Sequence, residues 1–263
     1  MRYADKVVIV TGGTRGIGLG CVRAFVHAGS TVVFCAPEPE AGVLLAHDLT
    51  VGGPGRASYV ACDVSRTDEV ERLVDGVVAR FGRLDCLVNN AGWHPPHRPI
   101  DDFGYDELRA LFELNVMGPF AACKRALPHL RKTKGSIVNV ASLVATMGQL
   151  EATTYVATKG ALLAFTKALA IDEARHDVRV NAISPGNVMT PLWQQAIDAA
   201  DDPVRCRADG EAAQPLGRMG TIEEAGRLAL FLAAEATFTT GVDHVLSGGA
   251  ELGYGRKTRK GEI

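Results

Sequence analysis

The chain lacks a long apolar segment, an excess of basic charge and closely spaced pairs of cysteines. Without an apolar run of about 18 residues or more, no membrane span is expected. The formal net charge of −2 offers no basic field to nucleic acid. The 6 cysteines show no C-x-x-C spacing, which argues against disulfides and metal sites and favours free thiols in a reducing compartment. An apolar run begins at Lys6 and leaves no room for a signal peptide, so we expect the cytosol.

The composition and the pattern of the chain predict a single α/β domain. Its 263 residues are 47% hydrophobic and 22% charged, which is typical of one globular unit. Short apolar runs alternate with helical patterns, and the longest of these patterns cover residues 105–132 and 153–175. The alternation predicts one doubly wound parallel sheet of about seven strands, a Rossmann-type fold with helices on both faces, over residues 1–263.

One stretch, residues 187–220, shows no clear periodicity. A long irregular segment in a compact domain is usually functional. It follows a predicted strand, at the edge where open α/β sheets bind ligands. We therefore expect a substrate lid over residues 187–220, with Trp193 closing over the substrate. Ordinary packing of Trp193 is the alternative interpretation.

A glycine-rich turn joins the first predicted strand to the first predicted helix. The motif T-G-G-T-R-G-I-G covers residues 11–18. Gly12, Gly16 and Gly18 allow a tight turn and a close approach of the backbone to a pyrophosphate. The helix that follows would direct its N-terminal amide groups at the phosphates. Because a strand precedes the motif and a helix follows it, the motif predicts a dinucleotide-binding loop.

Tyr155 and Lys159 stand four residues apart in T-Y-V-A-T-K, and Ser142 precedes them. Positions i and i+4 share one face of a helix. A free phenol has a pKa of about 10, and a nearby cation lowers that value. We therefore expect Tyr155 to exchange a proton near neutral pH and Ser142 to hold the substrate oxygen. Without other motifs, Tyr155 and Lys159 would be interpreted as an ordinary pair of solvated helix residues. The glycine loop in the same chain makes the catalytic interpretation the better one.

These motifs, in this order, resemble the short-chain dehydrogenase/reductase family. Further segments that carry the resemblance are Cys62-Asp63-Val64, Asn89-Asn90-Ala91-Gly92, Asn115 and Pro185-Gly186. The resemblance covers nearly the whole chain. It implies an NAD(P)-dependent enzyme that oxidises a secondary alcohol to a carbonyl by Tyr-Lys-Ser catalysis. Segments such as N-N-A-G-W-H-P-P and Q-P-L-G-R-M-G are similar to a branch that acts on 17-beta-hydroxysteroids or on free L-fucose, so a steroid or a sugar is the expected substrate.

The resemblance also implies roles for individual residues. The catalytic residues would be Asn115, Ser142, Tyr155 and Lys159, with Asn115 in a water-bridged proton relay to Lys159. Asparagine is a poor helix former, so its place inside a predicted helix also indicates a buried polar role. The residues expected to contact the cofactor are Gly12, Arg15, Gly16, Ile17, Gly18, Asp63, Val64, Asn90, Ala91, Gly92, Tyr155, Lys159, Pro185, Gly186, Val188, Thr190 and Leu192.

The sequence leaves the choice between NAD(H) and NADP(H) open. An NAD site usually carries an acidic residue at the end of the second strand, bonded to the ribose 2′-OH, but Ala36 stands there. No basic residue follows it to bind a 2′-phosphate; Arg15 can reach such a phosphate, and Glu38 would repel it. The resemblance favours NAD(H), with NADP(H) as the alternative. It places Asp63 at the adenine edge, with a strand-end turn as the other interpretation, and Thr190 at the nicotinamide carboxamide.

His94, Gln149 and Trp193 are the predicted substrate-binding residues. His94 and Gln149 can anchor polar groups, or they can be ordinary polar loop residues. The flat rings of Trp93 and Trp193 suit a steroid or the apolar face of a sugar. A free sugar needs partners for several hydroxyls, because a buried polar group without one costs about 1–3 kcal/mol, and Glu151 is a further candidate.

Two other functional classes stay open in the sequence. One is a dinucleotide-binding redox sensor without catalysis, and the other is an NADP-dependent 3-oxoacyl-carrier reductase. The expected partner is a small-molecule alcohol or carbonyl substrate. The resemblance further implies a homotetramer formed through the two longest helices and the C-terminal strand, with Gly253-Tyr254-Gly255 reaching a neighbouring subunit's pocket.

Overall fold

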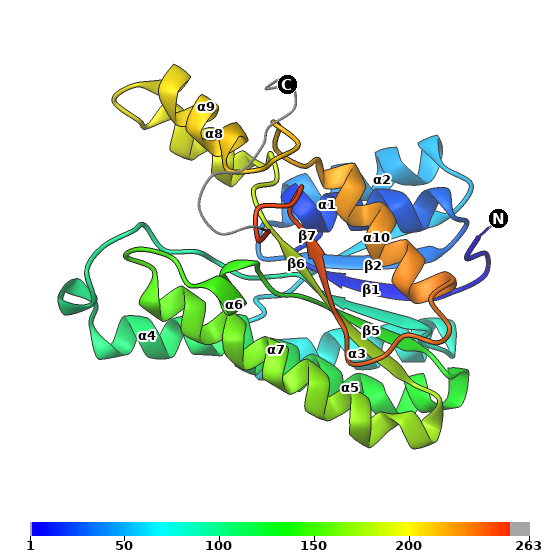
Figure 1. Ribbon diagram of the computed structural model, residues 1–263. Helices are drawn as coiled ribbons and strands as arrows, with labels where there is room; N and C mark the ends of the chain where they lie inside the picture. Colours follow the sequence, from blue (N-terminus) through cyan, green and yellow to red (C-terminus); the bar gives the residue numbers. More distant parts are fainter. Residues whose placement is uncertain (1, 253–263) are drawn as a thin grey trace.

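The computed structural model describes residues 2–252 and contains one sheet of seven parallel strands in the order β3-β2-β1-β4-β5-β6-β7 (Figure 1). Each neighbouring pair of strands runs parallel. This confirms the predicted doubly wound, Rossmann-type sheet. The strands are β1 Val7–Thr11, β2 Thr31–Ala36, β3 Arg56–Ala61, β4 Cys86–Asn89, β5 Ser136–Val140, β6 Arg179–Pro185 and β7 Asp243–Leu246.

Helices cover both faces of the sheet (Figure 1). One face carries α1 Gly16–His27, α2 Pro39–Gly52 and α10 Ile222–Ala234, and the other carries α3 Thr67–Phe81, α5 Gly118–Thr133 and α7 Thr153–Glu173. Within residues 2–252, no helix has the length and apolar character needed to cross a membrane. The shorter helical elements are η1 Ile100–Asp102, α4 Tyr105–Phe112, η2 Glu113–Met117, α6 Val144–Met147, η3 Ala174–His176, α8 Pro191–Asp198 and α9 Pro203–Ala212.

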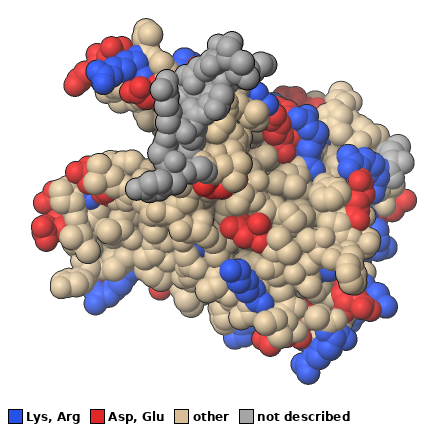
Figure 2. Space-filling view, in the orientation of Figure 1, with Lys and Arg blue, Asp and Glu red and all other residues tan. Residues whose placement is uncertain are grey.

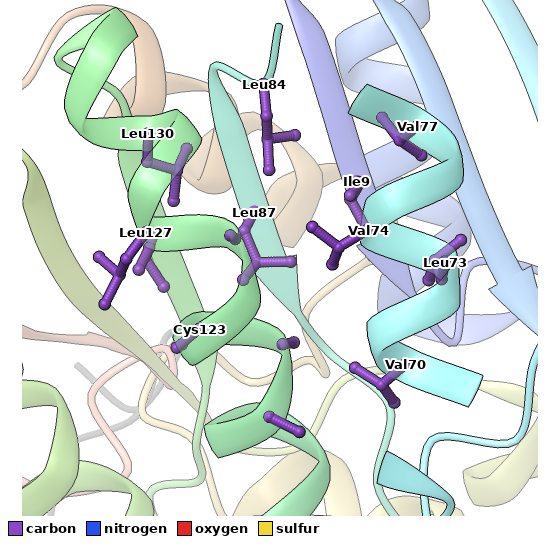
Figure 3. Close-up of a cluster of buried hydrophobic side chains, with 14 of the residues drawn as sticks. Ile9, Val70, Leu73, Val74, Val77, Leu84, Leu87, Cys123, Leu127 and Leu130 are labelled. Carbon is purple, nitrogen blue, oxygen red and sulfur yellow. The ribbon is translucent and has the colours of Figure 1, made fainter. Parts of the chain in front are cut away.

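Alternate residues of the strands fill two separate cores, because successive side chains of a strand point to opposite faces. In β1, Ile9 packs in the cluster that contains Val74 of α3 (Figure 3). Val8 and Val10 pack in the other cluster, which contains Phe25 of α1. Strands that are buried on both faces have nearly continuous apolar sequences, which is why these strands are recognisable in the sequence.

The order of the strands determines where a ligand can bind. β1 lies between β2 and β4, so the direction in which the chain adds strands reverses next to β1. Open α/β sheets bind ligands at the carboxyl ends of the strands at such a reversal. The loops that leave β1, β4, β5 and β6 all begin at this edge, and they carry the glycine loop, Asn90, Ser142 and Gly186.

The prediction of a long irregular segment over residues 187–220 is wrong. The segment contains the helices α8 and α9, and its ends are tied together by a bridge between Val188 and Gly220. Each helix begins with a capping side chain followed by proline: Thr190 accepts from the Trp193 N–H, and Asp202 accepts from the Arg205 N–H. A capping residue before a proline marks a helix start, so the signal is present in the sequence.

The predicted helix over residues 105–132 is also interrupted. Between α4 and α5 the chain forms η2, a π-helical turn that contains Asn115. Such turns inside helices often occur at functional sites. Here the turn directs the amide of Asn115 into the interior, where the side chain is 0% exposed.

Candidate active site

The glycine loop between β1 and α1 excludes larger side chains at two positions. Gly12 has a φ of 64°, in the left-handed region that favours glycine. A Cβ on Gly18 would lie 2.0 Å from the Gly12 carbonyl oxygen, so alanine cannot stand there without moving the loop. Arg15 is the N-cap residue of α1, but its side chain accepts no hydrogen bond from the helix. The first N–H groups of α1 are therefore free to bind the phosphates of a ligand. The loop therefore fits a pyrophosphate.

The loop after β4 holds the glycine loop in place. Asn90 Nδ2 donates to the carbonyl oxygens of Thr11 and Gly12, both at 3.0 Å. The backbone N–H groups of Asn90 and Ala91 donate to Thr11 Oγ1 at 3.0 and 3.1 Å. Sequence reasoning overlooked Thr11, although a threonine at the last position of the first strand, before a glycine turn, is a detectable signal.

Ser142, Tyr155 and Lys159 meet beside the end of β5. Ser142 follows β5, and both other residues lie on α7. Lys159 is buried, and its Nζ donates to the carbonyl oxygen of Val140 at 2.8 Å. The same Nζ lies 5.8 Å from the centroid of the Tyr155 ring. The Ser142 hydroxyl is a hydrogen-bond partner of the Tyr155 phenol. The structure therefore brings the three predicted catalytic side chains together.

The expectation that Lys159 brings the Tyr155 pKa toward neutrality is wrong for the chain by itself. Burial raises the pKa of Tyr155 to about 12, and the hydrogen bond with Ser142 lowers it only in part. Burial also lowers the pKa of Lys159 to about 8. The ammonium binds the Val140 carbonyl, and desolvation of the phenol outweighs its attraction. A further positive charge is needed at the phenol before it ionises near neutral pH.

Asn115 fastens the loop after β4 to α7. Its Nδ2 donates to the Trp93 carbonyl oxygen and to Thr158 Oγ1, both at 3.0 Å, and its Oδ1 accepts from the Trp93 N–H at 3.0 Å. A Cβ on Gly92 would lie 3.0 Å from Asn115 Oδ1 and 3.3 Å from Lys159 Nζ. Asn115 Oδ1 and Lys159 Nζ are therefore neighbours on the same side of Gly92.

We expect Asn115→Ala to destabilise the protein by about 1–3 kcal/mol, because it leaves buried backbone groups of Trp93 without partners. Turnover should fall as well, since the loop that carries His94 loses its attachment. Thermal unfolding and initial rates measure the two effects. Asn115→Asp is the matched control, because it keeps the acceptor and loses the donors. An alanine variant with wild-type melting temperature and rate would contradict this role.

His94 and Gln149 lie beside the predicted catalytic tyrosine. The centroid of the His94 ring is 4.1 Å from that of Tyr155, and His94 Nε2 lies 3.0 Å from Gln149 Oε1. Trp93 is 51% exposed, and its backbone N–H and carbonyl group are bound to Asn115. Glu151, on the same loop as Gln149, accepts a backbone hydrogen bond from the Arg98 N–H. The structure thus places His94 against Tyr155 and joins Gln149 to His94.

Trp193, the third of these residues, packs α8 against α9. Its ring atoms lie 3.0 and 3.1 Å from the position of a Cβ on Gly210. Trp193 and Gln149 also line one pocket of about 580 Å³. The surface over α8 and α9 carries both basic and acidic side chains, and a notch separates this lobe from the body of the molecule (Figure 2). The pocket is further lined by Asn187, Asp202, Arg205, Cys206, Asp209 and Gly210.

Several predicted cofactor contacts have local structural partners. Asp63 Oδ1 accepts from the N–H and the hydroxyl of Ser65 at 3.0 and 2.8 Å, which is the strand-end turn foreseen as the other interpretation. Thr190 caps α8 with its hydroxyl at 3.3 Å, and its methyl carbon lies 3.6 Å from a Cβ placed on Gly16. The start of the 187–220 segment therefore lies directly over the glycine loop.

The remaining predicted contacts surround the same edge of the sheet. The Pro185 carbonyl accepts from the Leu143 N–H, and the Gly186 N–H donates to the Leu246 carbonyl, so both anchor the end of β6. Ile17, in the first turn of α1, packs against the core, and Leu192 is 51% exposed at the start of α8. Val64 contacts Gly118, where a Cβ would lie 2.4 Å from the Val64 carbonyl oxygen.

The end of β2, where the adenosine ribose is expected, is bound by a tyrosine of the neighbouring strand. Tyr59 of β3 donates its hydroxyl to the Ala36 carbonyl oxygen at 2.5 Å. Glu38 precedes α2 as its N-cap residue. Arg15 is exposed and forms no ion pair with any residue in the described range 2–252.

The parallel sheet, the glycine loop and the Ser142-Tyr155-Lys159 group together define one class of enzyme. The chain belongs to the short-chain dehydrogenase/reductase family and is an NAD(P)-dependent oxidoreductase. The family model described as enoyl-(acyl carrier protein) reductase matches residues 12–251.

Known relatives resemble this chain over nearly its whole length. The L-fucose dehydrogenase of Bos taurus is 52% identical over 256 residues, which cover 97% of this chain and 93% of the relative. That of Mus musculus is 51% identical over 264 residues, which cover 100% and 94%. Among solved structures, the L-sorbose reductase from Gluconobacter frateurii complexed with NADPH and L-sorbose aligns with a TM-score of 0.90 and 29% identity, over 95% of this chain and 98% of that one.

Proposed function

We propose that this enzyme oxidises a free sugar, with L-fucose as the leading candidate, to the corresponding carbonyl compound. The observation that carries the proposal is the polar cluster at the reacting tyrosine: His94 lies against Tyr155, and Gln149, bound to His94, keeps a second amide N–H and a second carbonyl lone pair for a ligand. A sugar ring needs such partners for its several hydroxyls, whereas a steroid needs them only at its two ends. The identity of about half of all residues with L-fucose dehydrogenases supports the same choice.

We assign the chemistry to the side chains at the end of β5 and on α7. The Ser142 hydroxyl holds the substrate oxygen and Tyr155 Oη takes the hydroxyl proton. The nicotinamide, when bound, accepts the hydride and contributes positive charge to the site. Lys159 keeps its own charge close to Tyr155 because its Nζ is held by the Val140 carbonyl. Both groups favour the phenolate, which offsets the effect of burial.

We assign Asn115 to the outer end of the proton path. Two of its amide hydrogens and one lone pair of Oδ1 hold Trp93 and Thr158. The second lone pair of Oδ1 stays free to accept from a water. Asn115 Oδ1 and Lys159 Nζ both lie next to Gly92, near enough for water to connect them.

The cofactor that we propose is NAD(H). The pKa of the Tyr59 phenol is raised by burial, by Cys35 and, as a smaller cause, by the charge of Glu38, so Glu38 at the start of α2 lies near this phenol. The Tyr59 hydroxyl binds the Ala36 carbonyl at the end of β2. A carboxylate at this place repels a 2′-phosphate. Two features of the chain favour NADP(H) instead: Arg15, which forms no ion pair in the described range, and Ala36 in place of the expected aspartate. The L-sorbose reductase structure is a complex with NADPH.

We expect Ala36→Asp to lower the catalytic efficiency with NADP by about tenfold or more, because a second carboxylate would face the 2′-phosphate. Efficiency with NAD should fall little. Ala36→Asn is the matched control, since it has the same size without the charge. Initial rates with both cofactors, together with the melting temperature of each variant, check this. Equal cofactor ratios in the two variants would contradict the expected placement of the ribose.

Steady-state kinetics with L-fucose and with estradiol, each with NAD and with NADP, test the proposed substrate. The absorbance of the reduced nicotinamide reports turnover. We expect oxidation of L-fucose with NAD at the higher efficiency. Turnover of estradiol alone would replace the sugar by a steroid. Reduction of a 3-oxoacyl carrier with NADPH alone would indicate the carrier reductase, and cofactor binding without any turnover would indicate a sensor.

We also propose a cytosolic homotetramer. The two longest helices, α5 and α7, and the last described strand, β7, carry exposed apolar side chains, among them Phe120, Ile171 and Val245. A second copy that packs on these surfaces would bury them. Size-exclusion chromatography with light scattering measures the state, and a clean monomer would contradict it. The suggested reach of Gly253-Tyr254-Gly255 into a neighbouring pocket lies outside the described residues.

A further inference from the structure

A row of three polar side chains runs from Tyr155 to the mouth of the site. The His94 ring lies against Tyr155 and is stacked on the His97 ring, with 5.1 Å between the imidazole centroids and 24° between their planes. The side-chain amide of Gln149 bridges the Nε2 atoms of the two imidazoles. Its Oε1 is 3.0 Å from His94 Nε2, and its Nε2 is 3.3 Å from His97 Nε2. The proposed reaction gives no role to His97.

The hydrogen bonds of His94 fix one of its two ring protons. His94 Nδ1 lies 2.6 Å from the Pro95 carbonyl oxygen. A carbonyl oxygen can only accept, so Nδ1 carries a proton in every state. The charge of His94 therefore depends on Nε2 alone. With a proton, Nε2 donates to the Gln149 carbonyl oxygen. Without one, it accepts from the Gln149 NH₂ group after the amide has turned over.

The orientation of the Gln149 amide then determines what His97 can present. When the carbonyl oxygen accepts from His94, the NH₂ group faces His97 Nε2, which must offer a lone pair, so His97 is neutral. When the amide is turned, the carbonyl oxygen faces His97 Nε2, which donates, and His94 is neutral. If both histidines were cationic, an N–H of Gln149 would face an N–H of one imidazolium. The amide therefore disfavours a positive charge on both histidines at once, and it accommodates either one charge or none.

We propose that Gln149 and His97 are positioning residues that control whether His94 is charged beside Tyr155. The effect on catalysis rests on the proposed role of Tyr155 as proton acceptor. A cationic His94 against the phenol favours the phenolate, and a neutral one does not. His97 competes for the proton, so it limits the charge on His94. Oxidation of the alcohol, which needs the phenolate, should therefore depend on His97 although His97 does not touch Tyr155.

Other charged groups face this network from each neighbouring element. Glu151 favours a charge on His97, and Lys159 Nζ lies 5.8 Å from the centroid of the Tyr155 ring. Arg98, next to His97 in sequence, is paired with Glu107. Burial and the charge of His94 lower the pKa of His97, as competition for one proton requires. The groups of α9 and its cap that share the pocket with Gln149 are Asp202, Arg205 and Asp209.

His97→Phe is the variant that separates this role from packing. Phenylalanine keeps an aromatic ring stacked on His94 but has no ring nitrogen for Gln149. ¹⁵N NMR of the full-length, histidine-labelled protein, with His94 assigned by His94→Asn, follows the protonation of each ring nitrogen. We expect His94 Nδ1 to be protonated throughout in the wild type, and His94 Nε2 to be protonated in a larger fraction of molecules in His97→Phe than in the wild type at the same pH. Gln149→Leu should bring the two histidine titrations closer together.

The pH dependence of kcat/KM for alcohol oxidation tests the connection to Tyr155. In His97→Phe the charge persists on His94 to higher pH, so the acidic limb of the profile should move to lower pH. An unchanged His94 titration, or an unprotonated Nδ1, would overturn the proposal. A shifted titration with an unchanged acidic limb would overturn its connection to Tyr155. If the wild type oxidises no alcohol, the proposed function is overturned instead. The NMR result would then still decide whether His97 and Gln149 control the protonation of His94.

Discussion

Tyr155→Phe is expected to lower the rate of alcohol oxidation by about 10²–10⁴-fold or more, the usual contribution of a positioned proton acceptor. The substitution removes only the phenolic oxygen. The ring keeps its contact with His94 at 4.1 Å, and the glycine loop is held by Thr11 and Asn90. Cofactor affinity, measured by the fluorescence of the reduced nicotinamide, should therefore change little.

The matched control for this variant is Ser142→Ala, which keeps the phenol and removes its hydrogen-bond partner. It should lower the rate by a smaller factor. It should also move the acidic limb of the pH–rate profile to higher pH, because the hydrogen bond to Ser142 lowers the Tyr155 pKa. A phenylalanine variant that keeps a wild-type rate, with folding and cofactor binding intact, would refute the assignment of Tyr155.

Lys159→Met is expected to abolish most turnover and, at the same time, to stabilise the cofactor-free protein at pH 7. Burial lowers the pKa of Lys159 to about 8, below the 10.5 of an exposed lysine, so the folded state bears a cost for holding the charge. The shift corresponds to about 3 kcal/mol. Loss of the hydrogen bond to the Val140 carbonyl costs about 1–3 kcal/mol, so a net gain of at most about 2 kcal/mol is expected.

The pH dependence of stability distinguishes this cause from better packing. Below pH 8 the lysine is charged in both the folded and the unfolded state, and the full cost is present. Between about pH 8 and 10.5 only the unfolded state holds the proton, so the wild type gains stability relative to the variant as the pH rises. Chemical denaturation at pH 7 and at pH 10 measures the difference. A stability advantage of the variant that does not shrink at pH 10 would contradict the account.

The sheet and the cofactor loop could be predicted from the sequence because their signals are local. Strands buried on both faces have apolar sequences, and Gly12 and Gly18 are required by the backbone geometry around them. The position of Tyr155 relative to Lys159 follows from helical spacing. Ser142 joins them because β5 ends next to α7, which the alternation of strands and helices implies.

The features that could not be predicted depend on contacts between distant segments. The Tyr155 pKa is raised because the surrounding chain desolvates the phenol, and the spacing of Tyr155 and Lys159 in the sequence does not reveal this burial. The π-helical turn places Asn115 where its amide binds the Trp93 carbonyl and the Thr158 hydroxyl, which are distant in sequence. In contrast, the helices α8 and α9 could have been predicted from the sequence, because each begins with a capping residue, Thr190 or Asp202, that is followed by proline.

Transfer of deuterium tests the central claim most directly. Wild-type protein is incubated with NAD and L-fucose that carries deuterium on every carbon, and the reduced cofactor is analysed by mass spectrometry. The account predicts one deuterium in each molecule of reduced cofactor, at a rate that Tyr155→Phe suppresses. Reduced cofactor without deuterium, or formed equally fast by Tyr155→Phe, would contradict the assignment of hydride and proton transfer to this site.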